Sequence, residues 1–302
     1  MITPPYLKAG DGVAIIATAR KVKKAEVKAA ISILESWGLD VKPGKNLFKD
    51  QNQFAGSDEE RLDDLQRALN NKNVKAILVA RGGYGSVRVI DKVEFKRFIN
   101  NPKWIIGFSD ITVLHSHVHT HCGVETIHAP MLLNIPNLSE QALNVYKDAL
   151  FGKRLSYAVS KQTPLQLKMN RAGAGKGMLV GGNLSLLYSL IGSPSDIDTN
   201  GKILFIEDLD EYLYHIDRMM MNLKRTGKLQ NLAGLVVGGM TEMKDNEIPF
   251  GKTAEEIILD VVAEYNYPVC FGFRSGHLKD NYPLIFGREV SLKVGEKIEL
   301  IF

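Results

Sequence analysis

The sequence has little of what marks several large classes of protein. Its 302 residues include only two cysteines, Cys122 and Cys270. Two cysteines in a chain of this length do not make a disulfide framework and fit a reducing cytoplasm. No apolar run approaches the ~20 residues of a membrane span, and the start lacks a basic region followed by an apolar core. We therefore expect a cytoplasmic protein with no signal peptide and no membrane partner.

An excess of one charge is also missing. The 38 Lys and Arg residues against 34 Asp and Glu give a formal net charge of +4. The basic residues are scattered rather than striped, which does not favour nucleic acid as a partner. The composition, 45% hydrophobic and 24% charged, is ordinary for a globular protein. At roughly 150 residues per domain, the length suggests two domains.

In the first half of the chain, apolar runs alternate with amphipathic segments. We predict strands at 11–18, 39–43, 74–80 and 104–107, and helices at 24–38, 57–70, 86–90 and 111–122. This alternation predicts an α/β fold with a parallel sheet covered on both faces. Residues 155–177 are polar and irregular, so we predict a linker there, between domains at 1–154 and 178–302.

The second half is also mixed but richer in short strands. We predict strands at 202–206, 232–239 and 269–273, helices at 213–226 and 253–265, and edge or hairpin strands from 284 to 302. The run Met219, Met220 and Met221 indicates a packed helix face, because Met fills irregular gaps.

The stretch Trp104–Thr112 supplies a candidate nucleophile. An apolar run that ends at Gly-x-Ser and turns directly into a helix presents its Ser at the carboxyl edge of an α/β sheet. The N–H groups that open the helix lack partners and would face whatever Ser109 attacks. Ile111 stands where the full Gly-x-Ser-x-Gly pattern has its second Gly. The alternative is therefore that Ser109 only N-caps the helix.

The run Arg81–Gly85, Arg-Gly-Gly-Tyr-Gly, follows another predicted strand. Consecutive glycines allow backbone N–H groups to approach a ligand and allow positive φ. The run is either a cradle for an anion or oxyanion or a tight turn between strand and helix. Its glycine spacing does not match a dinucleotide fingerprint.

An acid and a histidine follow two further strands. Glu207 lies at the end of one, but the sequence alone does not choose among it and its neighbours Asp208, Asp210 and Glu211, which could instead cap the next helix. His277 follows another strand and is either a general base or a surface residue. Together with Ser109 they occur in the order Ser, acid, His, one of several orders compatible with a catalytic triad.

Four more histidines lie on the predicted helix 111–122: His115, His117, His119 and His121. Their spacing puts pairs on one face, as a metal site needs. However, no Glu lies between them and two helical His leave the coordination incomplete. We therefore predict no metal and expect these residues at the helix surface or an interface.

Five motifs in this order resemble the LD-carboxypeptidases, the murein tetrapeptide carboxypeptidases, a serine peptidase family that includes the microcin C self-immunity proteins. The motifs are Arg81–Gly85, Gly107–Asp110, Gly181–Ser185, Phe205–Asp208 and Ser275–His277. The resemblance covers essentially the whole chain. It implies a flavodoxin-like N-terminal domain, a smaller β-rich C-terminal domain, and an active site in the cleft between them.

The resemblance also implies roles for individual residues. It implies Ser109 as nucleophile, His277 as base and Glu207 as the acid of the triad. The oxyanion hole would be the N–H of Asp110 and an N–H of Gly82 or Gly83, with no metal and no cofactor. Candidates for binding the substrate are Arg81, Tyr84, Asn183 and Arg274, and Arg171 and Lys279 are further candidate cations for its carboxylate.

The function implied is hydrolysis of a cytoplasmic muropeptide that loses its terminal D-Ala, in peptidoglycan recycling, by a homodimer. The compact length favours this branch over an amidase that detoxifies a peptide–nucleotide, as the self-immunity proteins do. A third hypothesis is a non-catalytic protein that binds a small ligand on a flavodoxin-like fold, with a phosphate held at residues 81–85.

Overall fold

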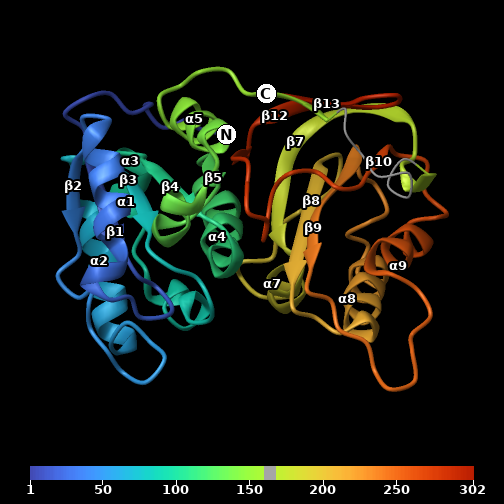
Figure 1. The fold of residues 1–302 in the computed structure, drawn as a ribbon, viewed down its shortest axis with the longest axis horizontal. Helices are drawn as coiled ribbons and strands as arrows, with labels where there is room; N and C mark the ends of the chain where they lie inside the picture. The colour runs from blue at the N-terminus through green and yellow to red at the C-terminus, as the bar shows by residue number, and fades with distance from the viewer. Residues whose placement is uncertain (160–167) are drawn as a thin grey trace. The chain divides into compact units, whose positions relative to one another are not determined.

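The computed structural model describes residues 1–159 and 168–302, and the chain divides into two compact units (Figure 1). The first unit comprises Met1–Arg154 together with Lys279–Ile285. The second comprises Leu155–Leu278 together with Phe286–Phe302. The chain therefore returns to the first unit for one short segment near its C-terminal end.

The first unit is built on a six-stranded sheet in the order β11-β5-β4-β3-β1-β2. Its strands are β1 (Gly12–Ile16), β2 (Asp40–Pro43), β3 (Val74–Val79), β4 (Trp104–Gly107), β5 (Thr126–His128) and β11 (Leu284–Phe286). The pairs among β1 to β5 are parallel, and the order β2-β1-β3-β4-β5 is that of flavodoxin-like folds. The predicted fold class is confirmed.

Helices connect these strands. They are α1 (Lys24–Ser36), α2 (Asp58–Asn70), α3 (Lys96–Asn100), α4 (Thr112–Cys122) and α5 (Glu140–Leu150), with a 3-10 helix, η4, at Leu132–Asn137. The start of α2 is a capping box, because the Ser57 hydroxyl accepts from the N–H of Glu60 (3.3 Å) and the Glu60 carboxylate accepts from the N–H of Ser57 (3.0 Å). Ser57, the first residue of the helix predicted at 57–70, is thus its N-cap.

The helix predicted at 86–90 is wrong. The chain forms two single 3-10 turns there, η1 (Ser86–Arg88) and η2 (Ile90–Lys92). The segment contains Val87, Val89 and Ile90, whose branched side chains lose rotamer freedom in an α-helix. A continuous helix is therefore poorly favoured at this point.

The second unit has a mixed seven-stranded sheet in the order β10-β9-β8-β7-β12-β13-β6. Its strands are β6 (Ser156–Val159), β7 (Gly173–Asn183), β8 (Ile203–Leu209), β9 (Gly234–Thr241), β10 (Val269–Cys270), β12 (Glu289–Val294) and β13 (Ile298–Ile301). The pairs from β7 to β10 are parallel, and those joining β7, β12, β13 and β6 are antiparallel. β12 and β13 form the hairpin expected in the tail.

The prediction of an irregular linker at 155–177 is wrong at both of its ends. Residues 156–159 form β6, and residues 173–177 begin β7. A Cβ atom added to Gly175 would lie 1.9 Å from the carbonyl oxygen of Ala233, and one added to Gly177 would lie 2.6 Å from that of Gly201. The glycines therefore permit close packing rather than flexibility. Residues 160–167 of the predicted linker lie outside the described residues.

The second unit's helices are α7 (Leu184–Leu190), α8 (Leu213–Arg225) and α9 (Ala254–Val261). Helices α8 and α9 pack against each other. Met219 and Met220 lie in the buried core, as predicted for this helix face, whereas Met221 is 39% exposed. Among the described residues, every helix is too short or too polar to cross a bilayer.

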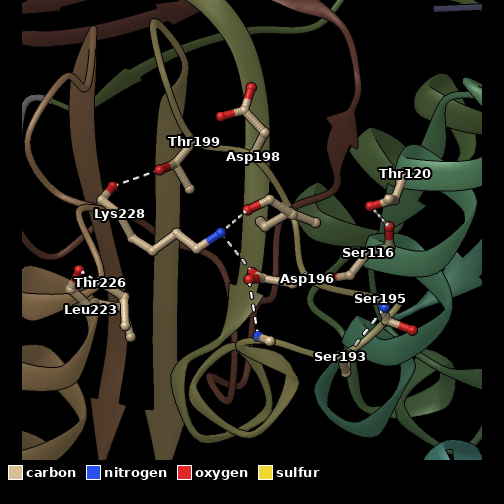
Figure 2. A network of polar contacts seen from close by, with 12 residues as sticks. Ser116, Thr120, Ser193, Ser195, Asp196, Asp198, Thr199, Leu223, Thr226 and Lys228 are labelled. Carbon is tan, nitrogen blue, oxygen red and sulfur yellow. Dashed lines mark hydrogen bonds and ion pairs between the residues drawn. The ribbon is translucent and has the colours of Figure 1, made fainter.

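Lys228 fixes the loop between α7 and β8 (Figure 2). Its ammonium donates to the carbonyl of Ile197 (2.6 Å) and pairs with the Asp196 carboxylate (2.7 Å), while the Thr199 hydroxyl donates to the carbonyl of Lys228 (2.6 Å). Both the side-chain ammonium and the backbone carbonyl of Lys228 therefore bind the loop that leads into β8. These contacts help to set the start of the strand that carries Glu207.

Candidate active site

Three loops leave the carboxyl ends of neighbouring strands in the first unit. They follow β1, β3 and β4, and comprise residues 17–20, 80–85 and 107–110. In a sheet of this order, the strand order reverses between β1 and β3, and a ligand crevice forms outside the carboxyl ends at such a point. The sequence-predicted Ser109 and the glycine run therefore lie at the expected edge.

Ser109 has a left-handed backbone, with φ at 61°. For a residue with a side chain this conformation costs on the order of 1–3 kcal/mol and persists where the surrounding structure enforces it, often at functional sites. Ser109 opens a 3-10 turn, η3 (Ser109–Ile111); the N-cap of that turn is Phe108 and no side-chain cap bond is present. The alternative in which Ser109 N-caps the helix is therefore wrong.

The glycine run passes beside Ser109. A Cβ atom added to Gly82 would lie 3.4 Å from the Cβ of Ser109 and 3.1 Å from Cε of Met131. Gly83 follows with φ at 110°, a conformation that favours glycine. The structure thus brings the β3 and β4 loops together, with glycine at the closest approach.

Asp110 anchors these two loops to each other. Its Oδ2 accepts from the N–H of Ser86 (2.9 Å), and the Ser86 hydroxyl shares a 2.7 Å hydrogen bond with the hydroxyl of Thr18, at the end of β1. Burial raises the pKa of Asp110, and the hydrogen bonds from Ser86 and Gly85 oppose the shift. The three loops therefore share one buried polar network.

Arg61 belongs to the same network, and the sequence analysis missed it. Its side chain is fully buried, donates to the carbonyls of Thr18 (2.5 Å) and Gly85 (3.0 Å), and pairs with Asp58. The signal was its spacing: Arg61 precedes Leu65 by four residues, on the apolar face of α2. A charged residue at such a position needs buried partners.

In the second unit, Glu207 and His277 form a close pair. Nδ1 of His277 lies 2.6 Å from Oε2 of Glu207, and the His277 backbone N–H donates to the same oxygen (3.0 Å). Glu207 is fully buried, at a point where the register between β8 and β9 shifts; such a bulge re-aims a side chain. With Nδ1–H donating to the carboxylate, Nε2 is the ring nitrogen that accepts a proton.

The pKa of His277 is raised. Burial acts in the opposite direction, but the hydrogen bond and charge of Glu207 and the charges of Asp208 and Glu242 outweigh it. The pair therefore holds the imidazole in one orientation and stabilises the imidazolium that a general base becomes.

The loop that carries His277 is packed against β9 through glycines. A Cβ atom added to Gly276, whose φ is 102°, would lie 2.6 Å from Oε2 of Glu207. One added to Gly238 would lie 2.4 Å from the carbonyl oxygen of Ser275, which accepts from the N–H of Gly239 (3.0 Å). The Glu207–His277 geometry thus depends on positions where no side chain fits.

The other acids near Glu207 have different partners. Asp208 accepts from the Asn183 amide (2.9 Å) and the N–H of Ser185 (2.9 Å), and burial, followed by the charge of Glu207, raises its pKa to about 7. Asp210 pairs with a lysine, Lys244 (2.6 Å), and Glu211 with a histidine of α8, His215 (2.5 Å). Of the acids that the sequence left open, Glu207 is the one bonded to His277.

Comparison with known proteins agrees with these motifs. Models of the LD-carboxypeptidase N-terminal and C-terminal domains match residues 13–129 and 176–292. A probable murein peptide carboxypeptidase of Bacillus subtilis is 35% identical over 99% of this chain and 93% of the relative. The chain belongs to the LD-carboxypeptidase family.

Further members of the family and its structural neighbours extend the comparison. A murein tetrapeptide carboxypeptidase of Pseudomonas aeruginosa is 28% identical over 94% of each chain. The crystal structure of a muramoyltetrapeptide carboxypeptidase from Oxalobacter formigenes matches with a TM-score of 0.86 at 30% identity, covering 96% of this chain and 98% of that one. Microcin C7 self immunity protein matches with a TM-score of 0.88 at 20% identity, a likeness of fold alone, over 100% of this chain and 98% of that one.

Two of the residues predicted to bind substrate make structural contacts. The Asn183 side chain is buried, accepts from the N–H of Leu186 (3.2 Å) and so caps α7. The Arg171 guanidinium donates to the carbonyls of Tyr265 (2.5 Å) and Val262 (2.9 Å), beyond the last turn of α9. Each side chain therefore satisfies backbone groups that a helix end leaves without an intrahelical partner.

The remaining candidates are exposed, except Arg81. Tyr84 is 47% exposed, and its ring centroid lies 6.3 Å from that of Phe54. Arg81 is half-buried, and Arg274 and Lys279 are exposed.

The four histidines were expected at the helix surface or an interface, and the surface position is wrong for three of them. His115, His117 and His119 are buried in α4, and His121 is exposed. Nε2 of His115 lies 2.9 Å from the carbonyl oxygen of Gly107, and burial lowers the pKa of His115 to about 4, the bond to Gly107 opposing it. α4 is buried on more than one face, so its polar residues pack inward. Within residues 1–159 and 168–302, no group of three metal-ligating side chains occurs.

Proposed function

We propose that this protein is a serine LD-carboxypeptidase that removes the terminal D-Ala of murein tetrapeptide during peptidoglycan recycling. The observation that carries the proposal is the Glu207–His277 pair, 2.6 Å apart, in a family member whose Ser109 has a left-handed backbone beside a glycine run. The names of the relatives from Bacillus subtilis and Pseudomonas aeruginosa support the substrate. A cytoplasmic homodimer belongs to the same proposal.

The proposed mechanism is acyl transfer. Ser109 Oγ attacks the carbonyl carbon of the bond between the L-centre and D-Ala, while Nε2 of His277 takes the hydroxyl proton and Glu207 stabilises the imidazolium. The N–H of Asp110 and an N–H of Gly82 or Gly83 stabilise the oxyanion. The imidazolium then donates its proton to the leaving amine, and water hydrolyses the acyl-enzyme, again with His277 as base. This requires His277 to reach the Ser109 hydroxyl in the working enzyme.

The test is mass spectrometry of murein tetrapeptide incubated with the purified protein and with Ser109→Ala. The wild type should remove one D-Ala, and Ser109→Ala should lose on the order of 10⁴-fold or more in rate, because the nucleophile is gone. Ser189→Ala, at an exposed serine of α7, is the matched control and should leave the rate unchanged. Release of D-Ala by Ser109→Ala at the wild-type rate would refute the triad.

A second candidate is an amidase or carboxypeptidase acting on a peptide–nucleotide, supported by the self immunity protein fold. A peptide–nucleotide conjugate incubated in parallel distinguishes the two. Cleavage of the conjugate alone would assign the protein to that branch. Binding of either compound without cleavage, unaffected by Ser109→Ala, would favour a binding protein.

A further inference from the structure

We propose that Arg20 binds the free α-carboxylate of the residue that leaves the substrate. A carboxypeptidase needs a cation for this group, and one of the cations suggested by the sequence, Arg171, is engaged with backbone carbonyls. Arg20 was not among those cations. The inference rests on the proposed function and adds the residue that would make the enzyme require a free chain end.

Arg20 lies at the end of the β1 loop, beside the glycine run. Its backbone N–H donates to the carbonyl of Gly82 (3.3 Å). A Cβ atom added to Gly83 would lie 2.6 Å from Cδ of Arg20 and 2.8 Å from its Nε. The arginine side chain therefore runs along the face of Gly83 that lacks a side chain, one residue from the point where Gly82 approaches Ser109. Both loops border the β1–β3 switch point, where this sheet order forms its ligand crevice.

Three neighbouring cations are neutralised, whereas neither Arg20 nor the half-buried Arg81 has an ion pair among the described residues. Lys21 pairs with Asp50 (2.7 Å), and Arg61 and Arg88 both pair with Asp58, the latter at 2.9 Å. Within residues 1–159 and 168–302, the guanidinium of Arg20 has neither an ion pair nor a hydrogen bond, and the residue is exposed. An unpaired guanidinium offers its planar donors to an incoming carboxylate.

The chemistry of the substrate sets the distance between its scissile carbonyl and its terminal carboxylate. In a terminal residue, only the amide nitrogen and Cα separate the scissile carbonyl carbon from the carboxylate carbon, so the two lie within about 4 Å. If Ser109 attacks the carbonyl and the glycine run holds its oxygen, the carboxylate of the substrate lies about one residue from Ser109. The side chain of Arg20 runs past Gly83, which directly follows the glycine that approaches Ser109.

The experiment combines two substrates with five enzymes. Wild type, Arg20→Gln, Arg20→Lys, Arg81→Gln and Lys21→Gln are assayed on murein tetrapeptide ending in D-Ala and on the same peptide ending in D-alaninamide, with leaving-group release followed by mass spectrometry. Lys21→Gln removes the adjacent cation, whose partner is Asp50, and is the matched control. Thermal unfolding of each variant checks folding, and Arg20→Lys tests rescue by a point charge.

The proposal expects an effect that depends on the carboxylate. Arg20→Gln should lower kcat/KM on the free acid about 10- to 100-fold, chiefly through KM, with little change on the amide, because a charge-assisted bidentate contact is lost. Arg20→Lys should recover part of the loss, and Lys21→Gln should match wild type. Equal losses on both substrates, or no loss, would refute the role of Arg20, as would an acid-specific loss in Arg81→Gln without one in Arg20→Gln. Failure of wild type to cleave either peptide would instead refute the proposed function.

Discussion

At the scale of the residue, the contact between Glu207 and His277 makes a prediction about pH. A general base must be neutral, so kcat/KM rises with pH through the pKa of His277, and a raised pKa places that rise above the ordinary histidine value of about 6.5. Glu207→Gln removes the charge and the acceptor at 2.6 Å. We expect the midpoint to move to lower pH and kcat to fall by on the order of 10⁴-fold, as when a triad acid becomes an amide.

The measurement is the pH–rate profile of both forms on murein tetrapeptide. Asp210→Asn is the control, because Asp210 is one of the neighbouring acids but pairs with the exposed Lys244; it should keep both the midpoint and the rate. A profile of Glu207→Gln with an unmoved midpoint would show that another group titrates.

At the scale of the element, the loop that carries His277 depends on Gly276. Two separate features require glycine at this position: its φ of 102°, and the 2.6 Å that would separate an added Cβ atom from Oε2 of Glu207. Gly276→Ala should therefore push the carboxylate away from the imidazole and lower kcat/KM by 10²-fold or more, on the order of the loss from misplacing a catalytic group by 1 Å. The assay is release of D-Ala from murein tetrapeptide.

Gly251→Ala separates the effect of the strained backbone from the effect of the steric clash. Gly251 also has a positive φ, 85°, but a Cβ atom added there has no neighbour within 4 Å. It should show the cost of strained backbone in thermal unfolding, about 1 kcal/mol or more, without loss of activity. Equal activities of the two variants would mean that the clash at Gly276 does not disturb the Glu207–His277 pair.

Glycines also show where sequence reasoning works for elements and where it fails. The alternation of apolar runs and helices was enough to predict the parallel sheet, because β1, β3 and β4 are buried on both faces. The Gly-rich segment that begins β7 predicted a linker, yet Gly175 is there because the carbonyl of Ala233 occupies the place of its side chain. Composition does not distinguish a flexible glycine from one in close contact, since the contact comes from a distant part of the chain.

The candidate site shows the same limit. Motif order and position at strand ends indicated Ser109, Glu207 and His277, because those signals are local. The buried Arg61 and the unpaired Arg20 depend on loops that meet only in the folded sheet. The spacing of residues could indicate that Arg61 is buried, but it could not predict the partners of Arg61 or the position of Arg20.

At the scale of the whole molecule, the path of the chain couples distant segments. β11 (Leu284–Phe286) follows almost the whole second unit in sequence, but it pairs with β5 (Thr126–His128) at the edge of the first unit's sheet. The segment before it is tied to the same unit, since the Asp280 carboxylate accepts from the N–H and hydroxyl of Ser139 (3.0 and 2.9 Å), at the start of α5. The three buried residues of β11 thus complete a sheet whose first strand, β1, begins at Gly12.

We therefore expect Leu284→Ala to destabilise a part of the chain far from it in sequence. Leu284 is fully buried, and its truncation should cost about 2–5 kcal/mol. Hydrogen exchange measured by mass spectrometry on the full chain should show faster exchange in β5 and α5. Ile258→Ala, a truncation in the core of the second unit, is the control and should speed exchange in α8 and α9 instead. If Leu284→Ala left β5 protected and loosened only β12, which follows it directly, the first unit would not depend on this returning strand, and residues 1–154 would suffice to form its stable sheet.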